Sequence, residues 1–73
     1  MNELDLHGIS HDSAIKLVED FVFRESHQGV SFSCRIITGN SKRLQDKIIK
    51  EVLDIYNFKY FIPSWNTGQI IVS

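Results

Sequence analysis

The first helix is predicted by apolar residues that recur at helical spacing in the first third of the chain. Ser10 stands at the position of a helix N-cap, and Asp12 follows in the first turn, where a negative charge suits the helix dipole. We expect the helix to run from about His11 to about Gln28, with Gly29 just beyond its end. Its apolar stripe consists of Ala14, Leu17, Val18 and Phe21, widened by Ile15 and Val22.

A second helix is predicted to begin after Thr38-Gly39-Asn40-Ser41, where an alternating segment gives way to helical spacing. We expect it to stop near Asn57, a residue type that tolerates the left-handed conformation common at helix ends. Its apolar stripe consists of Leu44, Ile48, Val52 and Ile55, broadened by Ile49, Leu53 and Tyr56.

Four segments predict strands. Leu4-Asp5-Leu6-His7-Gly8 alternates apolar and polar residues and then reaches a glycine that permits a turn. Val30 to Ile37 alternates for most of its length, which places Cys34 and Ile36 toward the helices and Arg35 away from them. Phe58 to Ile62 reads as a strand ended by Pro63, and a turn leads to the last strand, Gln69 to Val72.

The element order predicts an α/β fold of βαβαββ type. Two right-handed strand-helix-strand units place both helices on one face of a four-stranded sheet, and the closing hairpin makes the sheet mixed. The result is a two-layer sandwich whose other sheet face is open. That face is expected to hold Asp5, His7 and Arg35, while His7 and Thr38 lie at the carboxyl ends of parallel strands, where ligands gather.

Composition indicates one soluble globular domain over residues 1–73. The chain is 42% hydrophobic and 23% charged, with a net charge of −1 that gives no overall attraction to polyanions. It has no apolar run of the ~20 residues that a membrane span needs and no signal-peptide pattern at its start, so we expect no membrane association and a cytoplasmic location. The single cysteine, Cys34, is expected to be a small core residue.

Cations at the start of the second helix indicate an anion site. Lys42 and Arg43 face the positive end of the helix dipole, which is unfavourable by a few tenths to ~1 kcal/mol for each residue. A phosphate cradled by the free backbone N–H groups of Thr38 to Ser41 would relieve this conflict. The alternative is that Asn40 or Ser41 caps the helix and the cations are simply solvated.

Three apolar side chains near the open face could stack on bases. They are Ile37, Phe61 and Trp65. Packing in a thin core is the alternative, and we favour it for Trp65.

Three motifs together resemble one known family. The opening Leu4-Asp5-Leu6-His7-Gly8, the later Thr38-Gly39-Asn40 and the closing Gly68-Gln69-Ile70-Ile71-Val72 are similar to signatures of the Smr (small MutS-related) domain family, and the likeness spans nearly the whole chain. Ser41 stands where the second signature usually has glycine. The resemblance implies a two-layer α/β sandwich similar to the carboxyl-terminal domain of translation initiation factor three. It also implies nucleic-acid binding and, in many members, endonuclease activity on DNA or RNA.

By this resemblance Asp5 and His7 are the catalytic candidates. The imidazole could take a proton from an RNA 2′-hydroxyl, oriented by Asp5 if the two side chains meet, or the pair could hold one divalent ion, Mg²⁺ or Mn²⁺, that activates water. Only the metal route would serve DNA, and the sequence does not decide between the two routes. The candidate nucleic-acid contacts are Gly8, Arg35, Thr38, Gly39, Asn40, Ser41, Lys42 and Arg43.

Two other functions compete with an endonuclease. One is a module that binds nucleic acid or a ribosomal surface without cutting it. The other is a protein-interaction domain that uses the open sheet face, which would also allow a weak dimer of an otherwise monomeric protein.

Overall fold

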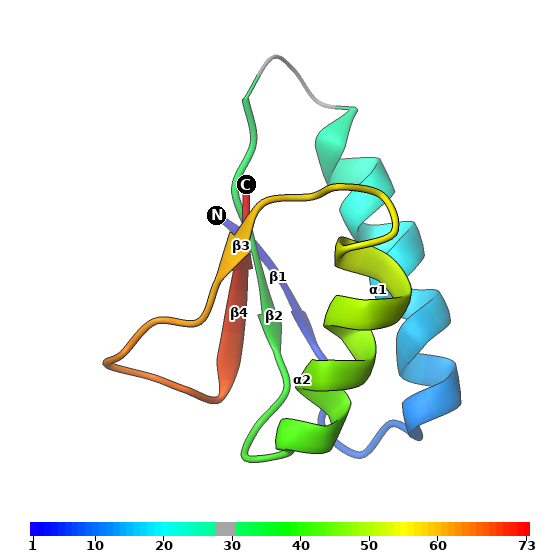
Figure 1. Ribbon diagram of the computed structural model, residues 1–73, viewed down its shortest axis with the longest axis vertical. Helices are drawn as coiled ribbons and strands as arrows, with labels where there is room; N and C mark the ends of the chain where they lie inside the picture. Colours follow the sequence, from blue (N-terminus) through cyan, green and yellow to red (C-terminus); the bar gives the residue numbers. More distant parts are fainter. Residues whose placement is uncertain (28–30) are drawn as a thin grey trace.

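The sheet has four short strands and follows the predicted two-layer plan. The computed structural model describes residues 1–27 and 31–73. In the order β1-β2-β4-β3, its strands are β1 (Asn2–Asp5), β2 (Cys34–Ile37), β4 (Gln69–Val72) and β3 (Tyr60–Phe61). β1 and β2 are parallel, and β4 is antiparallel to both of its neighbours. Both helices cover the same face of the sheet (Figure 1), so the fold is a two-layer α/β sandwich with a mixed sheet.

The first helix, α1 (His11–Ser26), begins at its predicted cap. The Ser10 hydroxyl oxygen accepts a hydrogen bond from the Ser13 backbone N–H at 3.3 Å. Ala14, Val18 and Val22 are fully buried, but Leu17 is exposed, so the predicted stripe is too wide on that side. The described helix ends at Ser26, and the predicted end at Gln28 and Gly29 lies outside the described residues.

The second helix starts at Ser41, one of the two residues that the sequence offers as a cap in the alternative to a phosphate site. The Ser41 hydroxyl accepts a hydrogen bond from the backbone N–H of Leu44 at 3.2 Å, and α2 spans Lys42–Ile48. The predicted stop is also confirmed, because Asn57 has a φ of +59°. Among the described residues, no helix is long and apolar enough to cross a membrane.

One turn of π-helix, η1 (Ile49–Leu53), follows α2 and changes which residues face the core. The Asp54 N–H bonds to the carbonyl of Ile49, five residues earlier. The wider turn shifts the phase of the apolar stripe, so the predictions of Ile55 and Tyr56 as stripe residues are wrong. Their exposed fractions are 62% and 43%, whereas Leu53 is fully buried.

The second and third strands are shorter than the sequence predicts, and β1 begins at Asn2, before the predicted start at Leu4. The segment 31–33 is not in a strand, β2 begins at Cys34, and the predicted start at Val30 lies outside the described residues. Of the predicted third strand only Tyr60–Phe61 pairs, whereas the last strand, Gln69–Val72, is as predicted. Cys34 and Ile36 are fully buried and Arg35 is half-buried on the other face, as the alternation predicts.

Trp65 is exposed, and the prediction that it packs in the core is wrong. Its exposed fraction is 77%, the highest among the large apolar side chains described. Aliphatic side chains from the sheet and helices already fill the space between the layers, so Pro63 is the residue of this loop that is buried. Phe61 is half-exposed.

The buried thiol of Cys34 makes the stability of the fold decrease at alkaline pH. Burial, followed by the nearby negative charge of Glu25, raises the pKa of this thiol from 9.0 to about 11. Because the folded state holds the thiol proton more tightly than the unfolded chain, the contribution is complete below the unfolded pKa. It is lost as the pH rises through the folded pKa.

We therefore expect the folded protein to lose about 2 kcal/mol of stability at pH 11 through this thiol. Urea unfolding of the wild type and of Cys34→Ala at pH 8 and pH 11 measures the effect. The wild type should lose more unfolding free energy than the variant between the two pH values. Equal losses in the two proteins would contradict the assignment.

Candidate nucleic-acid interface

Parallel pairing places two turns side by side at one edge of the sheet. Asp5 is opposite Ile37 in the register of β1 and β2, and the N–H of Leu6 continues the ladder to the carbonyl of Ile37 at 3.0 Å. The chain then leaves β1 through His7 and Gly8, and leaves β2 through the segment 38–41. These two turns lie together at the carboxyl ends of both strands (Figure 1).

Asp5 holds the turn that presents His7. Its carboxylate Oδ1 accepts a hydrogen bond from the backbone N–H of His7 at 2.9 Å, and Gly8 has a φ of +74°. Both side chains are exposed, and His7 lies in the turn rather than in the strand. Among the described residues the imidazole makes no hydrogen bond with Asp5, so this carboxylate positions the turn and not the ring.

The carbonyl oxygen of Gly68 ties the second turn to the start of β4. It accepts hydrogen bonds from the N–H groups of Thr38 and Gly39 at 2.9 and 3.0 Å, and from the Thr38 hydroxyl at 3.1 Å. A Cβ atom on Gly68 would lie 3.3 Å from the carbonyl oxygen of Gly39, tighter than most real contacts. The close approach explains a glycine at position 68, and the φ of +66° explains the one at position 39.

This arrangement corrects the prediction that the N–H groups of Thr38 to Ser41 are all free. Those of Thr38 and Gly39 are used inside the protein. Among the described residues, the N–H groups of Asn40, Ser41 and Arg43 make no hydrogen bond and remain available. Ser41 has a φ of −85°, so glycine is not required there and the serine serves as the helix cap.

The two cations at this edge lack ion-pair partners within the described part of the chain. Lys42 and Arg43 are both exposed and appear in no salt bridge. By contrast, Lys47 lies 3.2 Å from Glu51 and 3.6 Å from Asp12. The unfavourable charge order at the start of α2 is therefore real and is not relieved by nearby carboxylates.

Arg35 is a candidate contact that lies away from the edge. It is opposite Glu3 in the register of β1 and β2, and its guanidinium lies 3.2 Å from the Glu3 carboxylate. Its Nε atom is buried and has no hydrogen-bond partner among the residues that the structure describes. The structure therefore groups the other sequence-predicted residues at the strand ends and leaves Arg35 on the open face.

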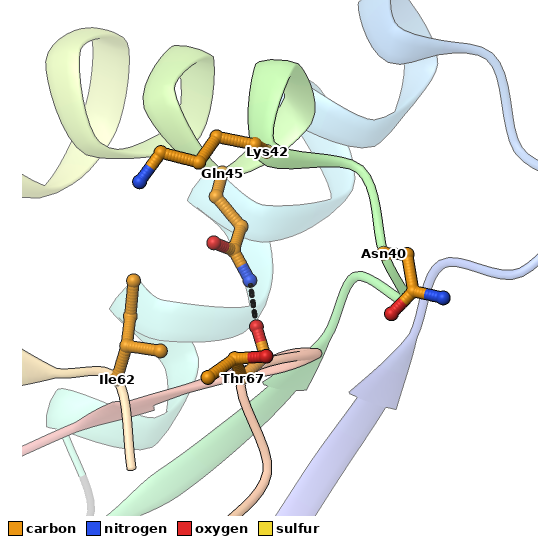
Figure 2. Close-up of a pocket in the computed structure, with 5 residues that line it drawn as sticks. All are labelled: Asn40, Lys42, Gln45, Ile62 and Thr67. Atoms are coloured by element: carbon orange, nitrogen blue, oxygen red, sulfur yellow. Dashed lines mark hydrogen bonds between the residues drawn. The ribbon is translucent and has the colours of Figure 1, made fainter. Parts of the chain in front are cut away.

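A pocket of about 220 Å³ lies beside the second turn and includes Gln45, which the sequence pattern did not predict as a site residue. Its lining residues are Asn40, Lys42, Gln45, Ile62 and Thr67 (Figure 2). Gln45 is only 5% exposed and donates from Nε2 to the Thr38 hydroxyl at 2.9 Å and to the Thr67 carbonyl at 2.7 Å. The only sign of this role in the sequence is the position of Gln45 one helical turn after the Ser41 cap, at the border of the apolar stripe.

Comparison of this chain with models of protein families, with curated proteins and with solved structures finds no match. In residues 1–27 and 31–73 there is no group of three or more His, Cys, Asp or Glu side chains that could hold a metal ion. An ion at this edge would therefore need ligands from the substrate or from water in addition to any side chains of the first turn.

We expect Asp5→Ala to lower the free energy of unfolding by about 1 kcal/mol, because the N–H of His7 loses its charged acceptor in an exposed turn. Asp5→Asn keeps an acceptor oxygen and should retain most of that stability. Urea unfolding at neutral pH measures both. If Asp5→Ala unfolded at the same urea concentration as the wild type, the carboxylate would not hold the turn.

Proposed function

We propose that the chain is an Smr-type domain that binds nucleic acid at the strand-end edge and cleaves its phosphodiester bonds with His7. The observation that supports this most is the juxtaposition of an exposed histidine with two cations and several backbone N–H groups on neighbouring turns, all without a partner among the described residues. The likeness of the opening and second motifs to that family points in the same direction.

Binding would depend on the phosphate backbone. The available N–H groups of Asn40, Ser41 and Arg43 can donate to phosphate oxygens, and the side chains of Lys42 and Arg43 add two positive charges. A local cluster of this kind can bind a polyanion even though the whole chain has a net charge of −1.

The chemistry that His7 can supply suits RNA. An imidazole near neutral pH can accept the proton of a 2′-hydroxyl while that oxygen forms a bond to the adjacent phosphorus. The bond from phosphorus to the 5′-oxygen then breaks, and the leaving oxygen takes a proton from the imidazolium or from water. The products are a 2′,3′-cyclic phosphate and a 5′-hydroxyl end. Asp5 acts in this scheme as a positioning residue for the turn.

DNA lacks the 2′-hydroxyl, so its cleavage would require an activated water. A divalent ion such as Mg²⁺ or Mn²⁺ would supply that activation. His7 and the carboxylate of Asp5 are the two exposed side chains of this turn that could hold it.

A second function is favoured by one observation. Because the Asp5 carboxylate bonds to the backbone of His7, the described residues supply the imidazole with no partner to orient it. A site of this kind fits a module that binds RNA, a ribosomal surface included, without cutting it.

We expect purified wild type to cut labelled single-stranded RNA in the presence of EDTA and His7→Ala to lose that activity by 100-fold or more, in the range of ~10²–10⁴ for loss of a general base. Supercoiled plasmid, with magnesium and with EDTA, is tested in parallel. His11→Ala is the matched control, because it changes another histidine near the same edge.

Plasmid nicking that requires magnesium would support the metal route instead. If the wild type retards both substrates in a gel and cuts neither, the nuclease proposal fails and the binding module replaces it. Equal activity of His7→Ala and wild type would remove His7 from the chemistry. Circular dichroism confirms that each variant is folded.

A further inference from the structure

The single tryptophan of the chain, Trp65, lies almost wholly in solvent. Its exposed fraction is 77%, although tryptophan side chains are highly buried in most folded proteins. Among the residues that the structure describes, the indole makes no aromatic contact and no hydrogen bond. Contacts within the domain therefore give no reason for so large an apolar ring at this position. Of the two roles that the sequence allows for it, packing is ruled out and stacking remains.

Hydrogen bonds on either side of Trp65 hold the loop that carries it. The N–H of Asn66 bonds to the carbonyl of Pro63 at 3.2 Å, which closes a turn around the tryptophan. The Asn66 side chain then accepts a hydrogen bond from the N–H of Gly68 at 3.0 Å, and Pro63 is buried. Because the loop is already ordered, covering the ring with a ligand costs little further conformational entropy.

This loop adjoins the strand-end edge. The Gly68 carbonyl accepts hydrogen bonds from the N–H groups of Thr38 and Gly39 in the second turn. Thr67 lines the same pocket as the side chain of Lys42. Figure 1 shows the loop, in orange, extending outward from the end of the sheet where the two turns lie. A ligand that contacts Lys42 therefore has this loop as its immediate neighbour.

We infer that Trp65 stacks on an unpaired base of a single-stranded nucleic acid that crosses the strand-end edge. This role rests on the proposed function, because it takes nucleic acid as the ligand, and it adds that the bound strand is single. Aromatic side chains bind single strands by stacking on the faces of the bases, and every base has such a face. In a duplex those faces are already covered by neighbouring base pairs.

The surroundings of the ring favour a base over an apolar protein partner. A protein docking surface is a patch of adjoining apolar side chains. The neighbours of Trp65 along the loop are instead polar and exposed, namely Ser64, Asn66 and Thr67. The two cations at this edge have no ion-pair partner in the described ranges. A flat ring among polar groups and next to positive charge matches a ligand with flat bases and an anionic backbone.

The test uses the fluorescence of Trp65, which reports on this ring alone because the chain has one tryptophan. The wild type is titrated, in EDTA to prevent metal-dependent cleavage, with single-stranded oligo(dT), with an abasic strand of the same length and with an oligo(dA)–oligo(dT) duplex. Anisotropy of an end label on each strand measures binding separately. We expect oligo(dT) to quench the tryptophan emission, and the abasic strand and the duplex to leave it unchanged when they are bound.

Substitutions of Trp65 then measure what stacking adds to the affinity. Trp65→Ala should bind oligo(dT) about fivefold or more weakly, and Trp65→Phe, which keeps a flat ring, should recover most of the loss. Ile55→Ala is the matched control, because Ile55 is also an exposed large apolar residue, at 62%, but follows η1 at the other end of the second helix. It should change the affinity less than about twofold.

The outcomes separate this role from the proposed function. If oligo(dT) binds without quenching and Trp65→Ala keeps its affinity, stacking is overturned and the binding edge stands. If Trp65→Ala loses affinity but Lys42→Gln/Arg43→Gln does not, stacking stands and the cationic edge fails. Equal quenching by the duplex would overturn stacking on an unpaired base, and emission that changes with protein concentration alone would assign the ring to a contact between two copies of the chain. If no strand binds, both proposals fail.

Discussion

The hydrogen bonds to the Gly68 carbonyl are the constraint on which the strand-end edge depends. This single oxygen accepts hydrogen bonds from the backbone N–H groups of Thr38 and Gly39 and from the Thr38 hydroxyl. The side-chain amide of Gln45 in turn bonds both to the Thr38 hydroxyl and to the Thr67 carbonyl. Together these bonds join the turn after β2, the first turn of α2 and the loop before β4. They fix which donors of the second turn face inward and which remain available, so they shape both the phosphate site and the pocket beside it.

The turn after β1 is held by a local hydrogen bond, whereas the turn after β2 is held by a distant segment of the chain. Asp5 forms its bond within three residues of chain, and the parallel pairing of β1 with β2 then places His7 next to the second turn. Positive charge is left unpaired at this edge. Glu3 pairs with Arg35 and Glu51 pairs with Lys47, but no carboxylate in the described ranges pairs with Lys42 or Arg43. A nearly neutral domain thereby presents a local cationic edge.

Much of the fold could be predicted from the sequence, because local signals decide it. Ser10 caps the first helix as predicted, Ser41 is one of the two alternative caps of the second, and period-two alternation placed Cys34 and Ile36 in the core. The rest depends on contacts between distant segments. The π-turn that exposes Ile55, the Gly68 carbonyl that occupies the N–H groups of Thr38 and Gly39, and the burial of Gln45 have no local signature. The sequence therefore predicted the residues of the candidate site, but it did not predict which of their N–H groups are available or that a pocket lies beside them.

The most direct test of the central claim, that nucleic acid binds at this edge, compares two charge-matched double variants. Affinity for a single-stranded oligonucleotide is measured over a range of salt concentrations for the wild type, for Lys42→Gln/Arg43→Gln and for Lys50→Gln/Lys59→Gln. We predict that the first pair weakens binding about tenfold or more at low salt and lowers the salt slope by about 1 to 1.5, whereas the second changes affinity less than about twofold. Equal effects of the two pairs, or no binding by the wild type, would contradict the claim.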